Sequence, residues 1–159
     1  MTTPTIYPAE FNPSTGDVFA RAPGLKTGAT QLVLAKATVP AETATSTVIG
    51  LIPFNAGARV SYASRINVAD LDTGTDVTLD VGYVYDDNTT YTNDPNAFIA
   101  ASTVAQAGGI DLFDATAGFQ FIAEADGWIA VTTGGGATDT EGDIEIEAII
   151  SYDSASVIA

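Results

Sequence analysis

The chain has 159 residues, enough for one domain with a hydrophobic core, and 46% of its residues are hydrophobic. It contains no cysteine and no histidine, which excludes disulfides, thiolate metal sites and every catalytic triad that needs an imidazole. Five basic residues stand against twenty acidic ones, and this net charge of −15 argues against binding to nucleic acid or to an anionic membrane surface.

Residues 1–29 differ in composition from the rest of the chain. Four of the seven prolines fall here, and apolar residues keep neither the helical nor the strand spacing. Large apolar residues still recur at intervals, which is unusual for a disordered tail. We interpret the segment as an extended N-terminal arm that packs either on its own domain or on a neighbouring subunit. Its predicted partner-binding anchors are Ile6, Tyr7, Phe11, Phe19 and Leu25.

Residues 30–159 are predicted to form one β-sandwich domain, because apolar residues recur there at every second position. This alternation is clearest in 59–68, 77–86 and 144–153, which we expect to be half-buried antiparallel strands. Weaker signals of the same kind predict further strands at 31–38 and 45–53 and a hairpin of 118–123 with 128–133. The expected fold class is an all-β antiparallel sandwich, with a jelly roll as one candidate topology.

One short helix is predicted between the strands. Asp94 can cap its first amides, and Pro95 suits the first helical position, where no partner for an N–H is needed. Gly108 and Gly109 would end it. We expect this helix to cover an open end of the sandwich.

The best candidate for a metal site is the acidic stretch 70–76. Its alternating aspartates resemble the first positions of a calcium loop. The match then fails, because Gly74 stands where a ligand is needed and Val81 occupies the place of the closing glutamate. A polar turn in which Asp72 bonds its own backbone explains the pattern better. We therefore predict no metal site, with Asp70, Asp72 and Asp76 as weak candidate ligands only.

Aromatic residues offer a second kind of candidate site. Trp128 together with Tyr83, Tyr85 and Tyr91 could form a platform for a sugar. A single tryptophan flanked by apolar strand residues is more typical of a core or an interface. The paired carboxylates at 86–87 lie in a polar stretch unsuited to raising a catalytic pKa. The sequence thus predicts neither an enzyme nor a cofactor.

Several segments resemble a pattern in small virion proteins of tailed bacteriophages. They are DLDTGT at 70–75, VG at 81–82, DD at 86–87, DPNAFI at 94–99 and AQAGG at 105–109. The resemblance covers about residues 30–153 and leaves out the arm. The proteins that it indicates are head decoration (cement) proteins and other minor capsid proteins.

The resemblance implies a structural protein with no catalytic residues. Its expected partners are the major capsid protein and further copies of itself in a homotrimer, with no nucleic acid and no membrane. It would be made in the host cytoplasm and located on the capsid surface of the virion. The alternatives are another phage component, such as a head fibre base, adaptor or tail protein, and a carbohydrate-binding adhesin module.

Overall fold

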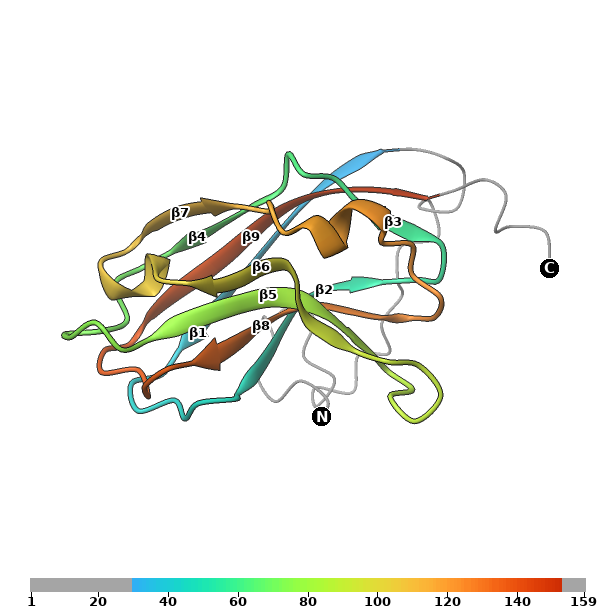
Figure 1. Ribbon diagram of the computed structural model, residues 1–159. Coiled ribbons are helices and arrows are strands. Elements are labelled where there is room, and N and C mark those ends of the chain that lie inside the picture. The colour runs from blue at the N-terminus through green and yellow to red at the C-terminus, as the bar shows by residue number, and fades with distance from the viewer. Residues whose placement is uncertain (1–29, 153–159) are drawn as a thin grey trace.

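The computed structural model describes residues 30–152, in which nine strands form two antiparallel sheets packed face to face (Figure 1). The strands are β1 (Gln31–Val39), β2 (Val48–Phe54), β3 (Ala58–Val60), β4 (Arg65–Val68), β5 (Thr78–Tyr85), β6 (Asp94–Ser102), β7 (Gly109–Leu112), β8 (Gly127–Gly134) and β9 (Gly142–Tyr152). One sheet has the order β1-β9-β4-β7, with β3 also paired to β9, and the other has the order β2-β8-β5-β6. The predicted all-β antiparallel sandwich is confirmed, while the jelly-roll topology stays a prediction.

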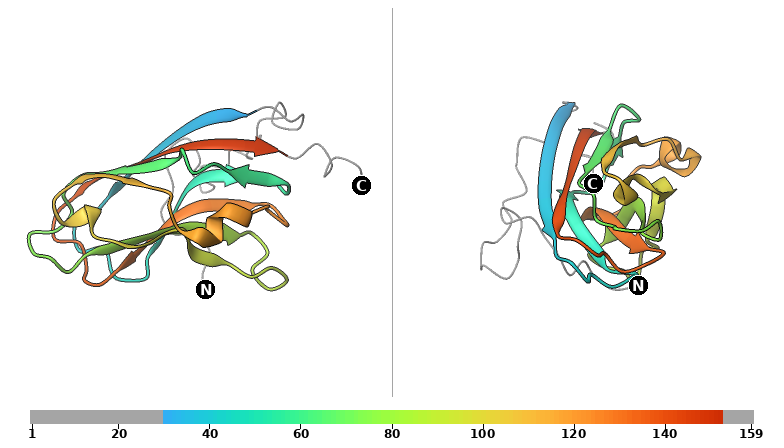
Figure 2. Two further views of the ribbon diagram at one scale, coloured as in Figure 1. Left: turned by 45° about the horizontal axis from the view of Figure 1, so that its top comes forward. Right: turned by 90° about the vertical axis from the view of Figure 1, so that its left-hand side faces the viewer.

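The hydrophobic core lies between the two sheets. In the five-stranded sheet, β4 and β9 alternate buried and wetter positions, so this sheet turns one row of side chains toward the other sheet. In the four-stranded sheet, β2 and β8 are buried at most positions. Ile66 and Ile146 from the five-stranded sheet and Leu79 and Ile129 from the four-stranded sheet are completely buried. The end-on view in Figure 2 shows β1 at the outer edge of its sheet.

The predicted strand 59–68 is wrong as a single element. It is divided into β3 and β4, which both pair with β9, and a turn separates them in which the Ser64 N–H donates to the Ser61 carbonyl. The Ser64 hydroxyl accepts the Ile149 N–H at 2.9 Å. Between β3 and β4, the Ser64 side chain therefore takes the place of a backbone partner for β9. The apolar periodicity of one segment cannot predict such an interruption.

The predicted helix after Asp94 is also wrong, because residues 94–102 form strand β6 on the edge of the four-stranded sheet. Proline is tolerated on an edge strand, since one side of that strand needs no ladder hydrogen bond. Gly82 on β5 allows the close approach, because a Cβ there would lie 2.1 Å from the Asp94 carbonyl oxygen. Only a three-residue 3-10 helix, η4 (Val104–Gln106), remains of the expected helix.

The hairpin predicted from 118–123 and 128–133 does not form. Its first half begins within a second 3-10 helix, η5 (Thr116–Gln120), and continues without strand pairing. Its second half is β8, which lies between β2 and β5 at the centre of the four-stranded sheet. The partners of β8 are therefore distant in sequence.

Candidate functional site

The acidic stretch after β4 is a tightly bonded turn. One carboxylate oxygen of Asp72 accepts the Gly74 N–H at 2.7 Å, and the other accepts the Asp76 and Val77 N–H groups at 2.8 and 2.9 Å. These amide bonds, opposed in part by burial, lower the pKa of Asp72 below its ordinary value. The turn that we favoured from the sequence is therefore present.

The three weak metal candidates do not gather around a common point. Asp70 accepts the Asp72 N–H at 3.2 Å, and the Asp72 carboxylate is turned toward backbone amides. Among residues 30–152 there is no group of three or more acidic side chains placed to hold a metal ion. Chemically, this stretch fixes the connection from β4 to β5.

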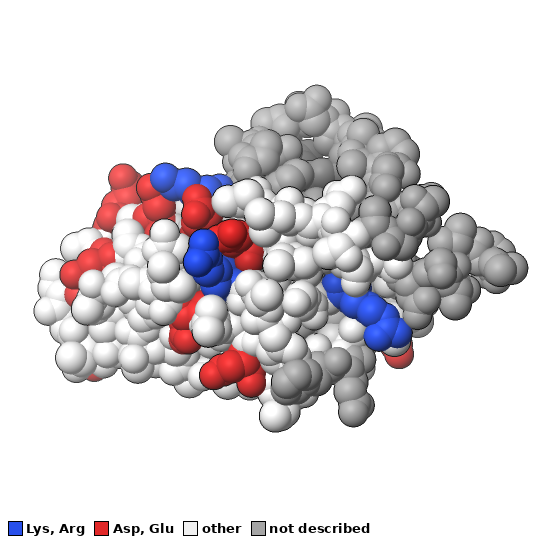
Figure 3. All heavy atoms as spheres, turned by 90° about the horizontal axis from the view of Figure 1, so that it is seen from above, with Lys and Arg blue, Asp and Glu red and all other residues white. Residues whose placement is uncertain are grey.

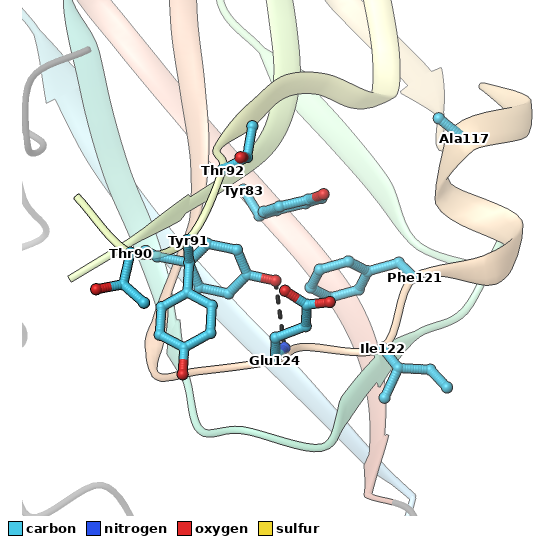
Figure 4. Close-up of a pocket in the computed structure, with 9 residues that line it drawn as sticks. Tyr83, Thr90, Tyr91, Thr92, Ala117, Phe121, Ile122 and Glu124 are labelled. Atoms are coloured by element: carbon cyan, nitrogen blue, oxygen red, sulfur yellow. Dashed lines mark hydrogen bonds between the residues drawn. The ribbon is translucent and has the colours of Figure 1, made fainter. Parts of the chain in front are cut away.

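A cleft of about 470 Å³ opens at one end of the sandwich, beside the 86–93 loop (Figure 4). Rings from β5 and from the segment after η5 meet there, with Tyr83 and Phe121 centroids 4.4 Å apart and Tyr85 and Tyr91 centroids 5.5 Å apart. The Tyr85 hydroxyl accepts the Glu124 N–H at 3.3 Å. The structure thus brings together three tyrosines that the sequence analysis singled out.

The cleft combines aromatic rings with polar groups, because Thr90, Thr92 and Glu124 line it as well. Burial raises the pKa of Tyr83 to about 12 and also raises the pKa of Tyr85, so both phenols stay protonated at neutral pH. Trp128 is not part of the cleft. It is 4% exposed and packs with Val48, Val84 and Ala130, while its indole N–H donates to Asp86 at 3.2 Å. The expected platform therefore lacks its tryptophan.

The second surface feature is the outward side of the five-stranded sheet, which we call the outer face (Figure 3). Four of its side chains are large and aliphatic, and each is more than half exposed: Leu32 and Leu34 on β1, and Ile110 and Leu112 on β7. Sequence analysis missed this face. Only the strand order brings β1 and β7 onto one surface.

The middle of the outer face is charged but balanced. Lys36 lies 2.6 Å from Asp143, and their hydrogen bond raises the pKa of Lys36 and lowers that of Asp143. Arg65 on β4 forms an ion pair with Glu147 on β9. Both pairs are partly exposed, so each contributes little to stability.

Charge elsewhere on the molecule is unbalanced, which predicts a salt-dependent stability. All three basic residues within 30–152 lie on the five-stranded sheet, whereas acidic residues occur over the whole domain. Raising ionic strength from about 10 mM to about 500 mM should screen the self-repulsion and raise the melting temperature by a few degrees. Calorimetry at both salt concentrations measures this, and equal melting temperatures would contradict it.

The arm anchors Ile6, Tyr7, Phe11, Phe19 and Leu25 lie outside the described residues, so their binding role stays a prediction. Within the described part of the chain, no helix has the length and hydropathy that a membrane crossing requires.

Comparison with known proteins gives a likeness in structure. No family model and no curated protein match the chain. A chain in the capsid of Ralstonia phage GP4 is 25% identical, with a TM-score of 0.60, over 78% of this chain and 86% of that one. A chain in the cyanophage Pam1 capsid asymmetric unit is 19% identical, with a TM-score of 0.59, over 86% and 94%. The second likeness shows the fold alone, and the first supports a phage capsid-related, structural protein of the virion.

Proposed function

We propose that this chain is a capsid decoration (cement) protein. It binds the major capsid protein on the outer shell of a phage head, stabilises that head and has no catalytic role. The observation that carries the proposal is the likeness, at 25% identity, to a chain of a phage capsid. A rigid, acidic β-sandwich suits the task, because such a protein must stay soluble before assembly and then bind firmly.

The N-terminal arm is proposed to provide part of the attachment. Its spaced aromatic and aliphatic residues can occupy separate pockets on a neighbouring subunit, as anchor residues do in protein interfaces. A homotrimer would engage several capsid sites at once, and linked weak contacts give tight overall binding. The sandwich would then hold the arms at a fixed spacing.

The proposed function predicts attachment to phage heads. Purified protein should bind saturably to phage heads that lack it and should raise the temperature at which those heads rupture. Co-sedimentation measures the binding, and a dye that reports released DNA measures the rupture during heating. If the protein binds heads without raising their rupture temperature, it is a component attached to the head that does not stabilise it, and the cement role is wrong.

The matched test of the arm uses the full-length chain. Replacing Tyr7, Phe11 and Phe19 together with serine should weaken head binding by at least about tenfold, since three apolar contacts are lost. Replacing Thr2, Thr3 and Thr5 with serine changes the same segment without removing an anchor and should leave binding intact. Equal binding by the two variants would show that the arm does not attach the protein.

The tyrosine-lined cleft favours a second candidate, a carbohydrate-binding module. Its volume of about 470 Å³ and its aromatic lining suit one or two sugar rings. A glycan screen separates this candidate from the first, because sugar binding should survive loss of the arm anchors and fail in Tyr91→Ala. Absence of head binding in every assay would instead favour a tail or fibre component.

A further inference from the structure

The aliphatic side chains of the outer face form two separate pairs at opposite edges of one sheet. The strand pairings place Leu34, Glu147, Arg65 and Leu112 in a single row across β1, β9, β4 and β7. Three strand spacings of about 4.8 Å separate the ends of this row, so the two leucines lie about 14 Å apart. The Arg65–Glu147 ion pair lies between them.

The charges of this face differ from those of the rest of the domain. Three acidic residues on β9, at positions 143, 145 and 147, face three basic ones, Lys36, Arg59 and Arg65, so the outer face has no net charge. Seventeen acidic residues lie within 30–152, so fourteen lie elsewhere in the domain, where the described chain has no basic residue. Two copies that approach through any other surface would bring uncompensated negative charges together.

The size of the face fits a contact between proteins. β9 has 11 residues and is roughly 35 Å long, and the face is about 15–20 Å wide where the four-residue strands β4 and β7 complete it beside β1 and β9. Because two neighbours would share this face, each contact buries less than the roughly 800 Å² per partner of a standard interface and belongs to the smaller, weaker class of specific contacts. Covering aliphatic side chains that are more than half exposed removes apolar surface from water and therefore favours association.

We propose that the outer face binds a second copy of this chain, with Leu32 and Leu34 of one copy against Ile110 and Leu112 of the next. Because the two apolar pairs lie at different edges, each copy offers one pair to each of two neighbours. A contact of this head-to-tail kind can close into a ring. The inference rests on the proposed function only where it takes that ring to be the trimer of a decoration protein.

Substitutions at either edge test the contact in the full-length chain. Light scattering after gel filtration should give the unaltered protein a solution mass of at least twice the 16.3 kDa of one chain. Leu34→Asp and Leu112→Asp should each weaken self-association by at least about tenfold, because each removes a leucine contact and places a charge in the interface. The matched control is Ile122→Asp, at an exposed aliphatic position away from the face, and it should leave the mass unchanged.

Cysteine cross-linking tests which edges meet, and the absence of cysteine from the chain makes the result unambiguous. An equal mixture of Leu34→Cys and Leu112→Cys proteins should form disulfide-linked pairs that contain one chain of each kind. The two positions within one copy are too far apart to be linked, because a disulfide needs Cα atoms within about 7 Å. Each single variant alone, and Ile122→Cys with either of them, should stay unlinked.

Three results would overturn the proposal. The first is an unaltered protein that is monomeric at the highest soluble concentration, and the second is an oligomer that neither aspartate variant weakens. The third is cross-linking of Leu34→Cys with itself in preference to Leu112→Cys. If the protein is monomeric and Leu34→Asp abolishes head binding, the outer face contacts the capsid protein instead of a second copy. In that case the proposed function stands and this inference fails.

Discussion

Replacing Asp72 with alanine is expected to lower the melting temperature by roughly 10 °C. The side chain is only 4% exposed, and its two oxygens accept three backbone N–H groups in the turn before β5. Alanine would leave those amides without their acceptor, and unsatisfied buried donors are costly. Thermal unfolding followed by circular dichroism measures the change.

The neighbouring aspartate is the matched control and separates a turn from a cation site. Asp76 is exposed and belongs to the same acidic stretch, so Asp76→Ala should change the melting temperature by no more than a degree or two. Calcium at millimolar concentration should shift neither the unaltered protein nor the variants. A calcium-dependent rise that both substitutions abolish would contradict the turn and restore the metal site.

The Asp72 carboxylate also makes the stability of the protein depend on pH in the acidic range. Its folded-state pKa is lowered by the amide bonds of Val77 and Gly74, from an ordinary value of 3.8. The stability that Asp72 supplies is therefore fully present above pH 3.8 and is lost as the pH falls through the lower folded value. The difference in melting temperature between the unaltered protein and Asp72→Ala should accordingly shrink below that pH.

Strand periodicity in the sequence predicted the fold class well, for a physical reason. In a half-buried strand the backbone imposes a side-chain period of two, so a stretch such as 144–153 shows which of its faces is buried even when its partner strands are unknown. The Asp72 turn was equally accessible, because the three amide bonds that its carboxylate accepts lie within five residues. The bonds from Asp139 and Gln106 to the same stretch could not be predicted in this way. Both features depend on local chemistry.

The errors arose where distant partners decide the conformation. Asp94 and Pro95 carry a helix-start pattern, but pairing with β5 draws this segment into the sheet. Ala101 has a positive φ of 50° at a register shift between β6 and β5, and its N–H donates to Asp80, a residue of β5. Local propensity is a weak signal, and tertiary contacts of this kind override it.

The outer face could not be predicted because it is a product of strand order. Leu32 and Leu112 are eighty residues apart in sequence and lie on one surface only because β9 and β4 intervene between their strands. In β1 the alternation places Leu32 in the same row as Lys36, whereas Leu112 alternates with Asp111 as a core residue would, so neither local sequence shows that the two leucines share a surface. Their exposure, 56% and 55%, is a property of the assembled sheet.

Replacing Phe54 with alanine is expected to lower the free energy of unfolding by about 3–5 kcal/mol. Phe54 on β2 is 1% exposed and contacts Tyr85 and Phe121 edge to face, at centroid distances of 6.1 and 5.7 Å. Alanine would remove both ring contacts and leave a cavity beneath the tyrosine-lined cleft. Urea unfolding followed by near-ultraviolet circular dichroism measures the loss, with an unchanged slope against urea as the sign of a simple stability effect.

Two further variants define the cause of that loss. Phe54→Leu keeps most of the volume and should cost less than Phe54→Ala, because only shape and the ring contacts change. Ile122→Ala truncates a side chain that is 43% exposed on the rim of the same cleft and should cost less than about 1 kcal/mol. If Phe54→Ala costs no more than Ile122→Ala, the rings would have to collapse into the space. The aromatic rings would then be mobile, and the cleft would lack the fixed shape that a sugar-binding site requires.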